Sequence, residues 1–267
     1  MNLKKYFAFT RAGIMECVNY RLSLFVMVIG NLLYLTLIYF VWKAIFASSG
    51  SDVVNGMTFE STMIYLVLAT ALFNFMEMYI VWEIGRDVQS GKIALNLLKP
   101  IEYKKYLFWC VSGSFVANFV FTFLPTFFVV LLITGGTIAI GLNLVYFMIA
   151  VILAVVINYN IDFFIGTICL YTESIWGINV MKQAVVMLLS GATIPLAFFP
   201  DGMRRVIDVL PFRAIYDTPL TLLLTKNPSI DLVVEKLGVS LIWLIVMSVL
   251  SNVFWKLSLR QITVNGG

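Results

Sequence analysis

Residues 22–42 read LSLFVMVIGNLLYLTLIYFVW, a run without a charged side chain that is bracketed by Arg21 and Lys43. About 20 apolar residues in a helix, each rising about 1.5 Å, cross the hydrocarbon core of a bilayer. A longer stretch, residues 106–161, also has no charged side chain. The sequence therefore predicts an integral membrane protein that crosses the bilayer several times.

The composition excludes a water-soluble globule. Of the 267 residues, 61% are hydrophobic and 12% are charged, against about 45–50% and about 25% in a soluble domain. The sequence has no histidine, the commonest general base and zinc ligand. Cys17, Cys110 and Cys169 are far apart, which favours small buried residues over metal ligands or disulfides. The net charge of +4 is too small to suggest a nucleic-acid partner.

We expect one all-α membrane domain over residues 1–267. Charge gaps, turn residues and length predict six transmembrane helices, at residues 22–42, 61–82, 106–133, 141–168, 175–199 and 237–256. Six spans put both termini on one side of the membrane. Twelve of the 18 lysine and arginine residues lie on that side, so the positive-inside rule predicts that both termini are cytoplasmic.

Three segments outside the spans also have helical patterns. Residues 1–20 predict a helix lying in the membrane surface, because apolar and charged side chains fall on opposite arcs. The external segment 199–226 predicts two short amphipathic or re-entrant helices that break at Pro211 and Pro219. The third segment, residues 83–105, is the main cytoplasmic feature.

An apolar stripe runs through this charged cytoplasmic segment. The stripe consists of Ile93, Leu97 and Leu98. The charged residues that bracket it are Arg86, Asp87, Lys92 and Lys99. An amphipathic helix that docks into a groove of another protein has this pattern. The alternative is that the same stripe rests on lipid headgroups.

Polar side chains within the predicted spans are candidate functional residues. Thr70, Asn74 and Glu77 share one face of the second span. An ionisable group at this depth is costly and is a functional candidate, although we favour an interhelical hydrogen-bond anchor for Glu77. Asp162 and Lys182 lie equally far before and after the presumed turn at Thr172, which predicts an ion pair between the fourth and fifth spans.

The sequence predicts a chain without catalytic chemistry of its own. The segment GRDVQSGKI (85–93) resembles a phosphate-binding loop, but its glycines are separated by five residues rather than four, and no Ser or Thr follows Lys92. We therefore expect no ATP hydrolysis, catalytic residue or metal site in this chain. An intramembrane hydrolase is also unsupported, because Ser190 and Lys182 lie too far apart along a helix for proton transfer.

Two stretches resemble the ABC-2 type permeases, the membrane subunits of ATP-binding-cassette exporters that include daunorubicin-type drug exporters. SGKIALNLLKPIEYKKY (90–106) is similar to the family's segment just after the second span. SGATIPLAFFPDGMRRVIDVLPF (190–212) is similar to its run from the fifth span into the outer helices, and it contains Pro195, Pro200, Pro211 and Phe212. Together with the span number, the likeness covers nearly the whole chain.

The resemblance implies an assembly in a bacterial cell membrane. Two permease chains, identical or homologous, would form the pathway, and two copies of a separate ATPase would bind ATP and Mg²⁺. Segment 86–99 would be the coupling helix that meets the ATPase, with Arg86, Asp87, Gly91, Lys92, Ile93, Leu97, Leu98 and Lys99 as its contact residues. The outer helices at 201–225 would cap the pathway, and export is the expected direction.

The walls available to a cargo are mostly apolar and aromatic. Isolated polar groups interrupt them at Asn31, Thr36, Asn74 and Thr193. Such walls suit an amphipathic or hydrophobic cargo, such as a drug or antibiotic, a lipid-linked compound or a peptide. The competing hypothesis is an ATP-independent secondary carrier that uses Glu77 and Asp162. Broken spans related by inverted repeats would favour that carrier, and the sequence indicates neither.

Overall fold

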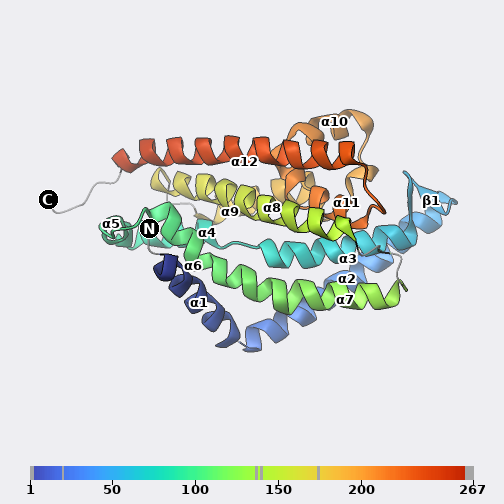
Figure 1. Cartoon of the computed structure of the whole chain (residues 1–267), viewed down its shortest axis with the longest axis horizontal. Coiled ribbons are helices and arrows are strands. Elements are labelled where there is room, and N and C mark those ends of the chain that lie inside the picture. Colours follow the sequence, from blue (N-terminus) through green and yellow to red (C-terminus); the bar gives the residue numbers. More distant parts are fainter. Residues whose placement is uncertain (1–2, 20, 136–137, 139–140, 173–174, 262–267) are drawn as a thin grey trace.

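The computed structural model describes residues 3–19, 21–135, 138, 141–172 and 175–261, and it is mostly helical (Figure 1). The helices are α1 (Leu3–Asn19), α2 (Arg21–Ser49), α3 (Phe59–Met76), α4 (Ile80–Gln89), α5 (Lys92–Leu97), α6 (Tyr103–Asn118), α7 (Leu124–Ile133), α8 (Leu142–Thr167), α9 (Ile175–Leu189), α10 (Asp201–Val209), α11 (Asp217–Leu224) and α12 (Ile230–Ser258). A π-helical turn, Phe119–Phe123, joins α6 to α7 without interrupting the rod. The all-α fold class therefore holds for nearly all of the described chain.

Five helical segments are long and apolar enough to cross a membrane. They are Val28–Ser49, Phe59–Gln89, Tyr103–Ile133, Leu142–Leu170 and Ile230–Ser258. Each overlaps a different one of the six predicted spans, and the fifth predicted span has no counterpart among these five segments. The long helices run roughly alongside one another in Figure 1, with α8 packed against α4, α11 and α12. The largest buried cluster draws on most of the helices and includes the fully buried Leu68 and Leu72 of α3 and Ala154 and Ile157 of α8.

Segments that were predicted to lie on opposite sides of the membrane are found at opposite ends of the helix bundle. In Figure 1, α5, the start of α1 and the end of α12 lie at one end, and β1 and α10 lie at the other. Residues 1–2 and 20 of the predicted surface helix lie outside the described residues. The described part of α1 packs along α6, where Gly13 and Gly113 bring the two backbones into contact.

The predicted fifth span is shorter than expected. Helix α9 has 15 residues, about 22 Å, whereas the hydrocarbon core is about 30 Å thick. The helix stops because Gly191 adopts a positive φ of 82°. Irregular backbone at this depth is tolerated where protein groups satisfy it. Here Tyr65 Oη donates to Gly191 O at 3.0 Å and Asp217 N donates to Ser190 O at 3.1 Å.

The loop between α2 and α3 contains a hairpin that was not predicted. Strands β1 (Val53–Val54) and β2 (Met57–Thr58) form an antiparallel hairpin. Asn55 and Gly56 both have positive φ, as a two-residue primed turn requires. Asn-Gly is the strongest short hairpin signal in a sequence, so this element was open to prediction.

Residues 199–226, which were predicted to be external, form two short helices as expected but do not break at Pro219. Helices α10 and α11 are separated by a 3₁₀ turn that begins at Pro211. Pro219 does not break a helix, because it lies in the first turn of α11, where backbone N–H groups have no intrahelical acceptor. Pro195 and Pro200 precede the short 3₁₀ turn Leu196–Phe198 and α10, respectively.

Candidate functional site

The second span is broken, which the sequence did not indicate. Helix α3 ends at Met76, Glu77 has an extended conformation with ψ of 116°, and α4 begins at Ile80. Residues 77–79 contain no Gly or Pro, so the break is stabilised by tertiary contacts. Asn158 Nδ2 of α8 donates to Met76 O at 2.9 Å and satisfies a carbonyl that the break frees.

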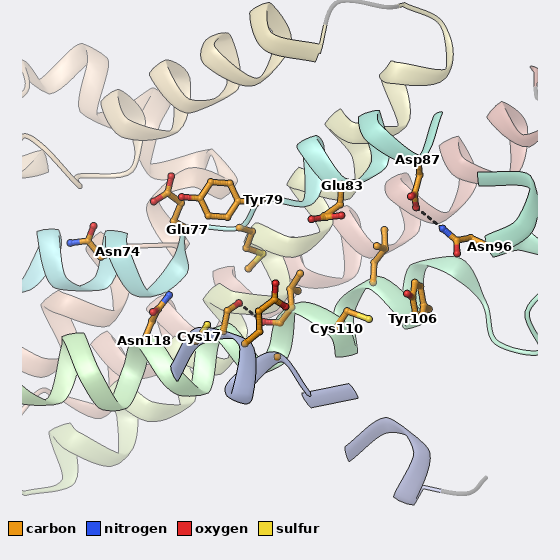
Figure 2. Close-up of a pocket in the computed structure, with 16 residues that line it drawn as sticks. Cys17, Asn74, Glu77, Tyr79, Glu83, Asp87, Asn96, Tyr106, Cys110 and Asn118 are labelled. Atoms are coloured by element: carbon orange, nitrogen blue, oxygen red, sulfur yellow. Dashed lines mark hydrogen bonds between the residues drawn. The ribbon is translucent and has the colours of Figure 1, made fainter. Parts of the chain in front are cut away.

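A cavity of about 620 Å³ lies beside this break. Its walls come from α1, α3, residues 77–79, α4, α5 and α6, and Figure 2 shows the lining side chains on these elements. The carboxyl groups in the lining are Glu16, Glu77, Glu83 and Asp87. The other polar groups include Asn74, Asn96, Ser114, Asn118, Tyr79 and Tyr106. A cavity of this size accommodates a small organic molecule.

A second cavity of about 250 Å³ brings together three of the predicted pathway residues. Asn31 of α2, Asn74 of α3 and Thr193 after α9 line it, together with Thr70. Its walls thus come from the predicted first, second and fifth spans. Thr36 does not line this cavity, and its hydroxyl donates to Leu32 O at 2.7 Å within its own helix. Glu77 lines the larger cavity instead.

The structure brings the predicted partners Asp162 and Lys182 together. Lys182 Nζ lies 2.9 Å from Asp162 Oδ1, and the Asp162 side chain is fully buried. The same lysine and Glu77 line a small space of about 20 Å³ between α3 and α9, which is room for one water molecule. The ion pair and the broken helix are therefore neighbours.

The segment that was predicted to be cytoplasmic, residues 83–105, folds back on the bundle rather than extending from it. Gly91 takes a φ of 69° and starts α5 immediately after α4. The carboxylate of Asp87 accepts hydrogen bonds from Asn96 Nδ2 at 2.6 Å and Tyr103 Oη at 2.7 Å. Asp87 thereby ties the short helix α5 to both α4 and α6. Arg86 pairs with Glu83 on the surface of α4.

The expected apolar stripe is distributed differently from the prediction. Ile93 is 4% exposed and packs into the core, so it is not part of the exposed apolar surface, and its contact with an ATPase stays a prediction. Leu95 is 67% exposed and Leu98 is 81% exposed, with Leu97 half-covered between them. The helix rotation that buries Ile93 also turns Leu95 outward. Lys92 and Lys99 remain exposed beside these leucines.

Two clusters of charged groups were missed by the sequence reasoning. Lys104 Nζ of α6 donates to Asn160 Oδ1 and Ser251 Oγ at 2.6 Å and to Asn252 Oδ1 at 2.8 Å. It therefore joins α6, α8 and α12 through neutral oxygens. The sequence treated Lys104 as a loop cation, and no local pattern marks its distant acceptors.

The second cluster holds the outer helices together. Arg213 lies 2.7 Å from Asp208 Oδ1 and 3.1 Å from Asp217 Oδ2, and Lys236 of α12 lies 3.9 Å from Asp217. Burial raises the pKa of the Asp217 carboxyl, and the Arg213 guanidinium opposes that shift. The i, i+4 spacing of Arg213 and Asp217 was an available signal.

Together, these features define a multi-pass helical membrane protein with polar cavities beside a broken span. Among the described residues, no group of three or more acidic or cysteine side chains could hold a metal ion. Residues 32–266 match the family described as ABC-2 family transporter protein, and the chain belongs to that family. It is thus an ABC-2 type permease, and membership implies association with ATP-binding-cassette ATPases. None of the curated proteins compared with the chain matches it.

Proposed function

We propose that this chain is the permease subunit of an ATP-binding-cassette exporter whose cargo is amphipathic or hydrophobic. The observation that carries the proposal is the family match over residues 32–266, which overlaps every described span. ATP and Mg²⁺ would bind in two copies of a separate ATPase subunit. The permease itself supplies the membrane path and no catalytic residue.

The exposed face of α5 supports a docking role for the cytoplasmic segment. Leu95, Leu97 and Leu98 form an apolar surface with lysines at its edges, a pattern suited to a groove on another protein. Asp87 connects α5 to α4, and α4 leads to the break at residues 77–79. Movement of the ATPase would reach the cavities along this route.

The arrangement of α2 supports a second permease chain, identical or homologous. The outward side of α2 exposes apolar side chains, including Leu32, Leu33 and Leu37. The 250 Å³ cavity opens between α2, α3 and the end of α9, so a partner packed against α2 would enclose a shared path there. Asn31, Asn74 and Thr193 would then contact the cargo, with apolar walls around them.

The direction and location follow from the charge distribution. The end with α5 carries most of the cations, and we assign it to the cytoplasm of a bacterial cell with both termini on that side. The outer helices α10 and α11 would cap the external end of the path. Export from the cytoplasm or the inner leaflet is the direction we propose.

Purification from mild detergent tests this proposal. The tagged chain should recover an ATP-binding-cassette ATPase, identified by mass spectrometry, with vanadate-sensitive ATP hydrolysis in the eluate. The double variant Leu95→Asp/Leu98→Asp should stay in the membrane but lower recovery of the ATPase by about tenfold or more, because both leucines lie in the docking surface. Val53→Asp, an equally apolar exposed site on the hairpin, should leave recovery unchanged. Undiminished recovery with the double variant would contradict the docking surface.

One observation favours a second candidate, a secondary carrier that is independent of ATP. The second span is broken beside Glu77, and half-helix ends beside an ionisable group are frequent in ion-coupled carriers. In this case the purified chain would lack an ATPase partner. Uptake into proteoliposomes would then follow an imposed proton gradient and would be abolished by Glu77→Gln.

A further inference from the structure

We propose that the cavity of about 620 Å³ is a binding site for an organic cation with an apolar body. The site lies within one chain, between helix α1 and the broken second span, and it adjoins the smaller cavity of the proposed path, with which it shares Asn74. Binding itself does not require the proposed transport. That the bound cation is the cargo rests on the proposed function.

The size and the walls of the cavity suit an organic molecule. Its volume of about 620 Å³ is within the range of small-molecule sites, about 300–1,000 Å³. Leu107, Val111 and Met78 supply apolar surface, and amide groups lie between them. The carboxylates are distributed around these walls rather than gathered into a group that could hold a metal ion.

The charges in the cavity walls indicate the sign of the ligand's charge. Among the described lining residues, every side chain that carries a full charge is a carboxylate. Glu83 is paired with Arg86, and Asp87 accepts two hydrogen bonds from neutral donors. Neither Glu16 nor Glu77 has a described lysine or arginine nitrogen within 4.0 Å. Glu16 is exposed, whereas Glu77 is partly buried, is hydrogen-bonded with the Tyr79 hydroxyl and is attracted by Lys182 from beyond ion-pair distance. A cation bound in the cavity would bring a closer opposite charge to both carboxylates.

A cation already lies against one aromatic residue of the lining. Lys99 Nζ lies 4.0 Å from the centroid of the Tyr106 ring, within the range of a cation–π contact. This contact is independent of the carboxylates and indicates that the ring accepts an ammonium group. Figure 2 shows a second aromatic ring, Tyr79, beside the Glu77 carboxylate on the opposite side of the cavity. Aromatic faces and carboxylates together form the usual environment of a bound organic cation.

The test uses the purified full chain in mild detergent and two probes of the same shape. Tetraphenylphosphonium and tetraphenylborate both carry four phenyl rings but have opposite charges. We expect saturable binding of the phosphonium, measured with radiolabel by equilibrium dialysis. We expect no saturable binding of the borate. Equal binding of the two ions would overturn the proposal, because it would show apolar partition without charge selection.

Variants of the two lining carboxylates that have no ion-pair partner within 4.0 Å among the described residues test the assigned site. Glu16→Gln/Glu77→Gln should weaken phosphonium binding by about tenfold or more, since it removes two charges from the walls. The matched control Glu60→Gln/Glu235→Gln makes the same change in net charge at exposed positions outside the cavity, and it should bind as the wild type does. An unchanged affinity in the first variant would contradict the site.

The native cysteines can show where the phosphonium ion binds, without any substitution. Cys17 and Cys110 line the cavity. Bound phosphonium should slow their alkylation several-fold, followed by mass spectrometry, whereas tetraphenylborate should not. Absence of protection at saturating phosphonium would place binding elsewhere and overturn the proposal. Because these assays need no ATPase, their result is independent of whether a partner is recovered in the purification experiment.

Discussion

The ion pair of Asp162 and Lys182 lies where the surrounding dielectric is low and both charges have lost most of their water. Asp162 Oδ1 meets the ammonium at 2.9 Å, while Oδ2 has no hydrogen-bond partner among the described residues. The hydrogen-bonding capacity of the buried carboxylate is therefore only partly satisfied. The pair matters for stability because burying either charge without its partner would carry a large free-energy penalty. It also fixes the relative depth of α8 and the short helix α9.

Removing one partner should destabilise the protein more than removing a surface pair does. Asp162→Asn should lower the free energy of unfolding by about 3–5 kcal/mol because Lys182 would stay buried without a carboxylate. The matched control Glu102→Gln breaks the exposed pair with Lys105 and should change it by less than about 1 kcal/mol. Thermal unfolding in detergent measures both. The swap Asp162→Lys/Lys182→Asp should restore the expression that is lost in the single variants. If it does not, the ion pair is not what stabilises the protein at these positions.

At the scale of elements, the contact between α1 and α6 depends on two glycines. A Cβ atom at Gly113 would lie 2.3 Å from Thr10 O and 2.7 Å from Gly13 Cα, closer than atoms can approach. Backbone atoms cannot rotate away as side chains can, so the helices would have to separate. The hydrogen bond between Thr10 Oγ1 and Ser112 Oγ, at 2.6 Å, would be lost with this contact.

Gly113→Ala should therefore reduce stability although alanine favours helices. We expect a loss of about 1–3 kcal/mol, as for other overpacked sites, seen as a lower midpoint of thermal unfolding. Gly238→Ala in α12 is the control, because a Cβ atom there meets nothing within 4 Å. That variant should be neutral or slightly stabilising. An equal midpoint for the two variants would mean that α1 is not held to α6 by this close approach.

The elements that were predicted from the sequence are those defined by long uninterrupted runs of apolar residues. Helices α2 and α12 contain no proline and only one glycine each, and hydropathy with charge gaps predicted both, although each extends beyond its predicted bounds. The break at residues 77–79 was missed because its stabilising donor, Asn158, is distant in sequence. The early end of α9 was missed for the same reason, since its acceptor groups are satisfied by Tyr65 and Asp217.

The part of the candidate site that was predictable is the part where polar residues recur on one face of a single helix. The shared face of Thr70, Asn74 and Glu77 led to residues that line two adjoining cavities. Glu16 and Glu83 join Glu77 only through tertiary packing of α1 and α4, and no single helix pattern reveals that grouping. The outward turn of Leu95 also depends on how α5 folds back onto the bundle.

At the scale of the whole molecule, the cavity of about 620 Å³ lies toward the same end of the bundle as α5, and α10 and α11 lie at the opposite end (Figures 1 and 2). Such an arrangement fits a path loaded at one face and closed at the other. The proposal therefore requires that α5 and the β1–β2 hairpin lie on opposite sides of the membrane, with α5 in the cytoplasm.

Labelling of single cysteines checks this orientation. In a background with Cys17, Cys110 and Cys169 replaced by alanine, Val53→Cys and Leu98→Cys introduce thiols at exposed positions on β1 and just after α5. In right-side-out membrane vesicles a membrane-impermeant maleimide should label Val53→Cys at once. It should label Leu98→Cys only after the vesicles are opened, and the cysteine-free chain should give no signal. Labelling of Leu98→Cys in sealed vesicles would place α5 outside, where no cytoplasmic ATPase reaches it, and would remove the basis for coupling through this helix.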